Sequence, residues 1–280
     1  MLWLRKQAKG ASKGDELVKP ATLEVDFAPD ILASKLEQLL EAVADHGGLE
    51  AFVAALEAKH RLFAEGLTRD SLDVMDRRAV QTLLDTVFPA RRRLNGVVAE
   101  MEEAELVGAI RELVHGAEPL AERMATFQAA FPTGEDNKAR RAAMDFAAEL
   151  LHFRDPERYP LMTRWVWDVN TVSGAIREFI AGNDAMSEIP LGESPETYEG
   201  VRAWMVETLS EQGFYRDLPY LIDLVMAWAY ADYMRAMSSS MGLMKAEFGA
   251  KDDPTEPARK LLGIDEGRSG ADRNGTETVH

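Results

Sequence analysis

Three histidines each follow a glutamate by three positions, a spacing that places both side chains on one face of a helix. Carboxylate and imidazole groups bind iron, manganese and zinc, and helical bundles with paired metals use Glu-x-x-His units together with further glutamates. If the three helices direct these faces into one interior, the sequence predicts a carboxylate–histidine metalloprotein, with oxidoreductase chemistry as one option. The candidate ligands are Glu57, His60, Glu112, His115, Glu149 and His152.

The same spacing also arises by coincidence, because glutamate is a common residue. Lys59, Arg61, Arg111 and Arg154 flank the candidate ligands, and flanking cations are more typical of a solvated helix face than of an interior metal site. Asp145 extends the last pair into a polar stripe along one helix face. A metal centre therefore stays an alternative rather than the leading interpretation.

Arginine and lysine side chains are concentrated in two further places. Guanidinium groups bind phosphate and carboxylate, so these residues form a candidate patch for an anion or for nucleic acid if the two halves of the chain pack together. A solvated helix face is the simpler alternative. The candidate patch consists of Arg91, Arg92, Arg93, Lys138, Arg140 and Arg141.

Large apolar side chains gather in the second half of the chain. Most of its tryptophans and tyrosines are best explained as core residues. Three serines interrupt the apolar pattern near the end of the last long helix, where Met237, Met241 and Met244 form a candidate surface for docking a protein partner.

The composition excludes several classes of site. The chain has no cysteine, which excludes disulfides, thiolate zinc sites, cysteine-ligated iron–sulfur clusters and cysteine nucleophiles. It contains no glycine-rich phosphate loop, no Gly-x-Ser-x-Gly elbow and no dinucleotide fingerprint.

The net charge of −16 disfavours nucleic acid, because most of the surface repels phosphate. A protein partner fits this charge better. No window reaches the roughly 20 apolar residues of a membrane span. Together with the lack of cysteine, this predicts a cytoplasmic protein.

Helical periodicity recurs along the chain between proline and glycine stops, and no segment has a strand pattern. This predicts an all-α, multi-helix bundle of two packed helical halves with disordered termini. The predicted divisions are a flexible basic tail at 1–27, an N-terminal subdomain at 28–131, a C-terminal subdomain at 132–250 and a disordered tail at 251–280. The predicted helices cover about 30–46, 49–64, 71–87, 89–115, 119–131, 137–153, two short helices within 155–182, 196–212 and 218–248.

The run from Ala147 to Leu161, which reads AAELLHFRDPERYPL, resembles a segment of helix-hairpin-helix DNA-glycosylase-like proteins. In that family a helix ending in Leu-His-Phe leads through a proline to Phe/Tyr-Pro-Ile. Pro132-Thr133-Gly134, followed by Lys138, lies where the family has its glycine-rich hairpin. The resemblance covers about residues 132–233.

Two departures from the family pattern decide what the resemblance implies. Met162-Thr163-Arg164 occupies the place where the family has its catalytic aspartate, and Glu135-Asp136-Asn137 replaces the hairpin's second glycine. A hairpin grips phosphate through backbone N–H groups, which acidic side chains oppose. The resemblance therefore implies a nucleic-acid-associated helical module without glycosylase chemistry.

Three functions follow from these patterns. The leading interpretation is a non-catalytic helical accessory or interaction protein, which the lack of nucleotide and nucleophile motifs favours. The alternatives are the metalloprotein and the nucleic-acid-associated module. The sequence itself names no catalytic residue.

Overall fold

The computed structural model describes residues 17–132, 137–240 and 253–265. Within these ranges the chain forms eleven α-helices, two short 3-10 helices and no strands, which confirms the all-α prediction. The first half contains α1 (Pro29–Ala44), α2 (Gly48–Gly66), α3 (Arg69–Asp73), α4 (Arg77–Asp85), α5 (Phe88–Glu100), α6 (Glu103–His115) and α7 (Leu120–Ala129). The second half contains α8 (Lys138–Arg154), η1 (Ala175–Phe179), η2 (Asn183–Ala185), α9 (Pro195–Glu211), α10 (Leu218–Ser240) and α11 (Glu256–Leu262).

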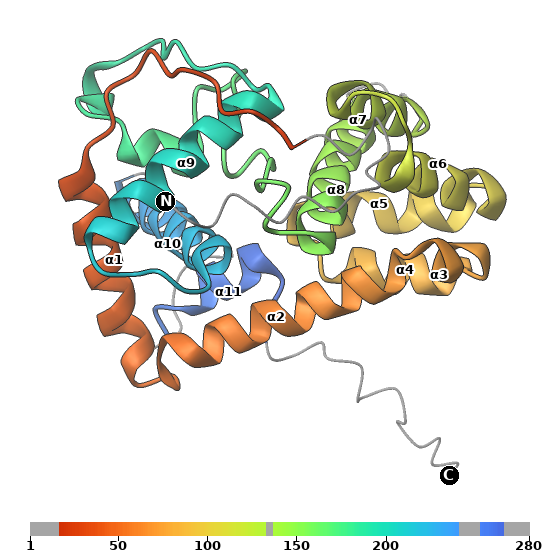
Figure 1. Ribbon diagram of the computed structural model, residues 1–280, viewed down its shortest axis with the longest axis horizontal. Coiled ribbons are helices and arrows are strands. Elements are labelled where there is room, and N and C mark those ends of the chain that lie inside the picture. Colours follow the sequence, from red (N-terminus) through yellow and green to blue (C-terminus); the bar gives the residue numbers. More distant parts are fainter. Residues whose placement is uncertain (1–16, 133–136, 241–252, 266–280) are drawn as a thin grey trace.

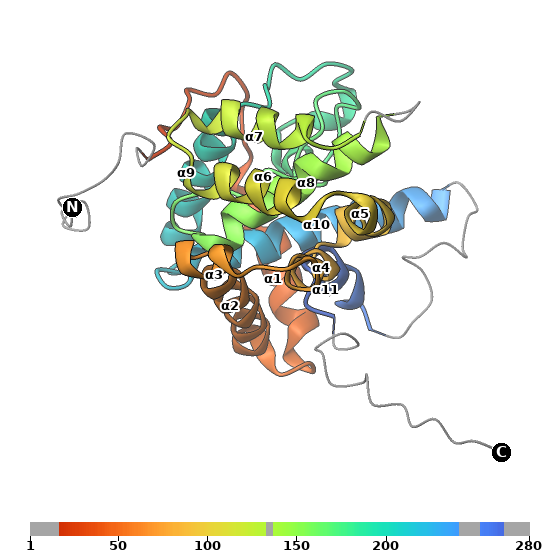
Figure 2. The ribbon, with the colours of Figure 1, turned by 90° about the vertical axis from the view of Figure 1, so that its right-hand side faces the viewer.

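The central element is α8, which packs against α2, α5, α6 and α7 (Figures 1 and 2). Every side chain from Ala142 to Phe153 is buried except that of Met144. Four alanines in this stretch let the neighbouring helices approach closely, while Phe146 and Phe153 fill the space between them. Because α8 is buried all round, its polar residues must find partners inside the protein.

A second group of helices is organised by α10, which packs against α1, α9, α11 and η1. The long α2 runs beneath both groups and contacts α8 as well as α1 and α10 (Figure 1). The predicted halves, 28–131 and 132–250, therefore pack into one hydrophobic core. Of the described residues, no helix has the length and apolarity needed to cross a membrane.

Parts of both predicted tails belong to the fold. The Ala21 N–H donates to the Glu196 carbonyl at 2.8 Å, and the Phe27 ring stacks on Trp204 with centroids 4.6 Å apart. Gly200 permits this approach, because a Cβ there would lie 2.7 Å from the Ala21 carbonyl oxygen. The flexible-tail prediction for 1–27 is thus wrong for residues 17–27; residues 1–16 lie outside the described chain.

The disordered-tail prediction for 251–280 is wrong for residues 253–265, which contain α11. Leu261 and Leu262 lie in the core, 3% and 1% exposed. The sequence predicts disorder here because two adjacent leucines are too short an apolar pattern to indicate a helix among so many polar residues. Residues 251–252 and 266–280 are outside the described ranges.

Some predicted helices are shorter or absent. The segment 155–182, predicted as two helices, is mostly turns and contains only η1, because Pro156 and Pro160 prevent helix continuation. The helix predicted over 89–115 is two helices, broken where Met101 adopts extended backbone angles. Arg77 stabilises the break, since its guanidinium donates to the Met101 carbonyl at 2.6 Å and its backbone N–H to the Glu103 carboxylate.

Candidate functional site

The polar face of α8 is the most chemically distinctive feature of the interior. Asp145, Glu149 and His152 lie four and three positions apart, on one side of the helix, and each is at most 2% exposed. Each has a different partner from another part of the chain. We call these three residues and their partners Arg164, Lys59 and Asp223 the α8 polar face.

Asp145 holds the loop that follows Pro160. The Arg164 backbone N–H donates to Oδ1 at 2.9 Å, and its guanidinium donates to Oδ2 through Nε at 3.0 Å and Nη2 at 2.5 Å. Burial raises the pKa of Asp145, while the hydrogen bonds and charge of Arg164 oppose the rise. Arg164 belongs to the Met162-Thr163-Arg164 run that departs from the glycosylase-like pattern, and here it fastens the loop to α8.

Glu149 pairs with Lys59 of α2, with 2.6 Å between Oε2 and Nζ. The Lys59 ammonium also donates to the carbonyls of Thr86 at 3.1 Å and Leu262 at 2.7 Å, so all three of its N–H groups have acceptors. Its Nζ lies 4.0 Å from the centroid of the Phe153 ring. Three acceptors around one amine indicate the charged form of Lys59.

The charged residues around it predict a solvated helix face for Lys59, whereas its side chain is buried and the residue is 5% exposed. The signal that could have located it is its register: Lys59 falls in step with Phe52, Leu56 and Phe63, the buried residues of α2. A lysine at an apolar-face position predicts a buried acidic partner, since an unpaired buried charge is very costly.

The pH dependence of stability should report on Glu149. Burial raises its pKa to about 7 from 4.5, although Lys59 and His152 oppose the rise. Burial likewise lowers the pKa of Lys59, against the effect of Glu149. The folded protein therefore binds the Glu149 proton more tightly than the unfolded chain does, and the stability this proton contributes is lost as pH rises from about 4.5 to about 7.

We expect the unfolding free energy of wild type to fall relative to that of Glu149→Gln by about 3 kcal/mol across that window. Urea denaturation followed by circular dichroism at a series of pH values measures the difference. Glu112→Gln, on the exposed face of α6, is the matched control and should run parallel to wild type. Parallel curves for Glu149→Gln as well would contradict the raised pKa.

His152 and Asp223 form the third pair of the α8 polar face. The His152 Nδ1 lies 2.8 Å from the Tyr159 carbonyl oxygen, and its Nε2 lies 2.8 Å from Asp223 Oδ2. A carbonyl only accepts, so Nδ1 carries a proton; the contact between Nε2 and the carboxyl group then needs a second proton. The pair therefore holds one proton between two buried side chains, and His152 has no free lone pair for a metal or for proton abstraction.

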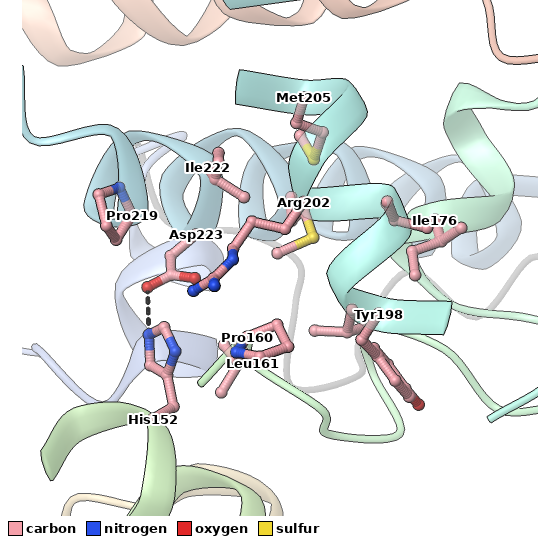
Figure 3. Close-up of a pocket in the computed structure, with 13 residues that line it drawn as sticks. His152, Pro160, Leu161, Ile176, Tyr198, Arg202, Met205, Pro219, Ile222 and Asp223 are labelled. Atoms are coloured by element: carbon pink, nitrogen blue, oxygen red, sulfur yellow. Dashed lines mark hydrogen bonds and ion pairs between the residues drawn. The ribbon is translucent and has the colours of Figure 1, made fainter. Parts of the chain in front are cut away.

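A narrow cavity adjoins this pair between α9, α10 and the 160–166 loop (Figure 3). Its wall is mainly apolar, and its polar side chains are His152, Asp223, Arg202 and Tyr198. The space open to the centre of a water molecule is about 20 Å³, enough for about one water.

The other two polar side chains of the cavity are also engaged. Arg202 donates to the Pro156 carbonyl at 2.8 Å and pairs with Glu199 at 2.7 Å. The Tyr198 hydroxyl donates to the Trp167 carbonyl at 3.1 Å, and burial raises its pKa. The polar side chains in the cavity wall therefore use most of their hydrogen-bonding atoms on other protein groups, and few of these atoms remain for a molecule inside the cavity.

The structure does not bring the six predicted metal ligands together. His60 Nδ1 contacts the Phe153 carbonyl at 2.8 Å, and His115 Nε2 contacts the Leu67 carbonyl at 2.8 Å. Glu57 is half-buried on α2 and Glu112 is exposed on α6. In the described part of the chain, no group of three or more acidic or histidine side chains could hold a metal ion. The histidines instead tie helix ends to neighbouring carbonyls.

The predicted basic patch divides between the two ends of α5. Glu100 and Met101 at its C-terminal end line one groove with Arg140 of α8, whereas Arg91 lies nine residues earlier, about 13 Å along the axis. Arg91 donates to the Asp85 carbonyl at 3.1 Å, and Arg140 donates to the Phe131 carbonyl at 3.1 Å. Arg92, Arg93, Lys138 and Arg141 are exposed. The six residues do not form one patch.

The predicted docking methionines are only partly described. Met237 is 37% exposed near the end of α10. Met241 and Met244 lie outside the described residues.

Comparison with known protein families, curated proteins and solved structures gives no significant match to this chain. The resemblance of residues 132–233 to helix-hairpin-helix glycosylase-like proteins therefore stays a prediction.

Proposed function

We propose that this chain is a non-catalytic helical interaction protein that acts by binding another protein. The observation that carries the proposal is the saturation of the α8 polar face. Lys59 has three acceptors, both ring nitrogens of His152 have partners, and Arg164 makes three hydrogen bonds to Asp145. Groups held in this way fix helices relative to one another.

The cavity supports the same conclusion. A catalytic histidine needs a nitrogen that can exchange a proton with a substrate, within hydrogen-bonding reach of it. His152 would have to give up Tyr159 or Asp223 to do so. Ligand pockets usually enclose about 300–1,000 Å³, and the space beside His152 takes about one water.

The charge of the chain suggests the chemistry of the partner. A net charge of −16 favours a protein with a basic surface. Glu37 and Glu41 on α1 and Asp45 at its C-cap are exposed at four-residue spacing, where like charges repel and a basic partner would relieve the repulsion. Such binding should weaken as salt screens the charges.

The test combines binding with activity. A partner captured by cross-linking in the source cells is purified, and its affinity is measured by calorimetry at low and high salt. We expect saturable binding that weakens with salt and weakens further in a Glu37→Lys/Glu41→Lys/Asp45→Lys variant. The same preparations are assayed for hydrolase, oxidoreductase and base-excision activity. Turnover by wild type that Asp223→Asn abolishes would overturn the proposal.

A nucleic-acid-associated module is the second candidate. It is favoured by the packing of α7 against α8 as a helical hairpin, with Lys138 and Arg141 exposed in the first turn of α8, where the helix dipole also attracts phosphate. Filter binding of single- and double-stranded DNA and RNA at two salt concentrations tests it. Salt-sensitive binding that Lys138→Glu/Arg141→Glu removes would establish this function, and binding that the variant leaves unchanged would reject it.

A further inference from the structure

The short helix α11 depends on a surface made by the rest of the chain. An isolated helix of this length is unstable in water. It packs against α10 and α5 (Figure 1). Its buried residues are Pro257, Ala258, Leu261 and Leu262. On the α2 side, the Arg259 guanidinium lies 4.4 Å from the centroid of the Phe52 ring. Helix formation and docking of residues 253–265 are therefore one event.

Lys59 contacts the end of this helix. Its ammonium donates to the carbonyl of Leu262, the last residue of α11, and to that of Thr86, which caps the C-terminus of α4. Carbonyls at helix C-termini lack intrahelical donors and carry partial negative charge, so they suit a buried cation. Lys59 thus recognises the end of a helix, whatever the outward-facing side chains of that helix are.

Two of the three contacts of the Lys59 ammonium do not involve α11. Glu149 and Thr86 hold Lys59 from α8 and α4, so the cation keeps its counter-charge and one carbonyl when Leu262 leaves. We call the surface made by α2, α5, α10 and the α4 terminus around Lys59 the α11 seat.

Glycine at position 263 completes the fit. Gly263 has a φ of +67°, and a Cβ there would lie 1.7 Å from the Thr86 carbonyl oxygen. Every other residue type would both strain the backbone and collide with the end of α4. The seat therefore selects a helix that ends in two apolar residues and a glycine.

The other attachments of the segment are weaker. Asp253 accepts hydrogen bonds from the backbone and hydroxyl of Thr255 and lies 3.3 Å from His46 Nε2. Asp265 lies 4.0 Å from Arg91. Partly exposed ion pairs of this kind contribute little. Specific docking thus rests on the leucines, Gly263 and Lys59.

We propose that the α11 seat is a binding site for a short helix of the pattern Ala-x-x-Leu-Leu-Gly, filled in cis by residues 253–265 and open in trans to the same segment of a second copy. A second copy is the occupant with assured complementarity, because its identical sequence makes identical contacts. This inference rests on the proposed interaction function and locates a binding surface for it. Its test uses only this chain, so the two can fail separately.

The first measurement is hydrogen exchange of the full-length protein. Gly263→Ala is compared with Gly213→Ala, which imposes the same kind of left-handed strain at φ +92° but has open space for its Cβ. We expect amides of 253–265 to exchange at least about tenfold faster in Gly263→Ala, since left-handed strain alone is worth about that factor. Protection of α8 should not change, and Gly213→Ala should leave α11 as in wild type.

The second measurement adds a fluorescent peptide of residues 253–265 in trans. It should bind full-length Gly263→Ala, in which docking of the chain's own segment is weakened at least about tenfold, and bind wild type at least about tenfold more weakly. A peptide with Leu261→Ala and Leu262→Ala should bind neither protein.

Three outcomes would overturn the proposal. The first is unchanged protection of α11 in Gly263→Ala. The second is loss of protection through α5 and α8 as well, which would make α11 an integral part of the core. The third is equal binding of the wild-type and leucine-substituted peptides.

Discussion

Replacing Lys59 by methionine is expected to lower the free energy of unfolding by about 3–5 kcal/mol, because it leaves the Glu149 carboxylate buried without a counter-charge. It also removes the donor shared by the Thr86 and Leu262 carbonyls. The loss should be smaller at about pH 5 than at about pH 8, since a carboxyl group that has lost its cation takes up a proton more readily. Urea denaturation at the two pH values measures both effects.

The double variant Lys59→Met/Glu149→Leu separates charge from packing. Removing both charges takes away the desolvation cost along with the attraction, so we expect it to recover at least half of the single-variant loss. Lys35→Met serves as the control, because Lys35 pairs with the part-exposed Asp232 and should cost about 1 kcal/mol or less. A Lys59→Met loss no larger than that of Lys35→Met would show that the buried pair contributes little.

Asp223→Leu is expected to destabilise the protein by about 3 kcal/mol, because His152 Nε2 then faces apolar side chains with no partner. Asp223→Asn should lie within about 1 kcal/mol of wild type. The side-chain amide that Asp223→Asn introduces can donate to Nε2 of a neutral imidazole, while Nδ1 keeps its bond to the Tyr159 carbonyl.

Thermal and urea unfolding of the two variants compare these costs directly. The nitrogen NMR shifts of His152 then show which ring nitrogens carry a proton. In Asp223→Asn we expect a proton on Nδ1 alone. In wild type we expect a proton on Nδ1 and a second proton on Nε2 or shared between Nε2 and Asp223. Equal stabilities for Asp223→Leu and Asp223→Asn would contradict the hydrogen-bond assignment.

Local pattern sufficed for much of the helical architecture. The bounds of α2, α8 and α9 agree with the predicted helices to within about two residues, because proline and glycine mark their ends. The polar stripe of Asp145, Glu149 and His152 was also readable from spacing alone. The prediction of two short helices within 155–182 was wrong. This segment has an amino-acid composition typical of short helices, but it folds mostly into turns.

The partners of the α8 polar face could not be read from the same pattern. Lys59 is 90 positions from Glu149, and Asp223 is 71 positions from His152. Glu-x-x-His spacing constrains two side chains on one helix, whereas ligand convergence depends on how three helices are rotated about their axes. The structure turns Glu149 toward a lysine, His152 toward an aspartate, and all three histidines toward backbone carbonyls. Only a three-dimensional arrangement contains that information.

The burial of α8 on all sides has a consequence for synthesis on the ribosome. The surfaces that enclose it on α2, α5, α6 and α7 are translated before α8 itself. Until α8 has been synthesised, the apolar residues of these four helices have no central helix to pack against. The nascent chain therefore exposes apolar surface of the kind that holdase chaperones bind. Lys59 is made early as well and acquires its counter-charge only when Glu149 leaves the exit tunnel. The order of translation thus postpones closure of the part of the core around α8 until α8 itself has emerged.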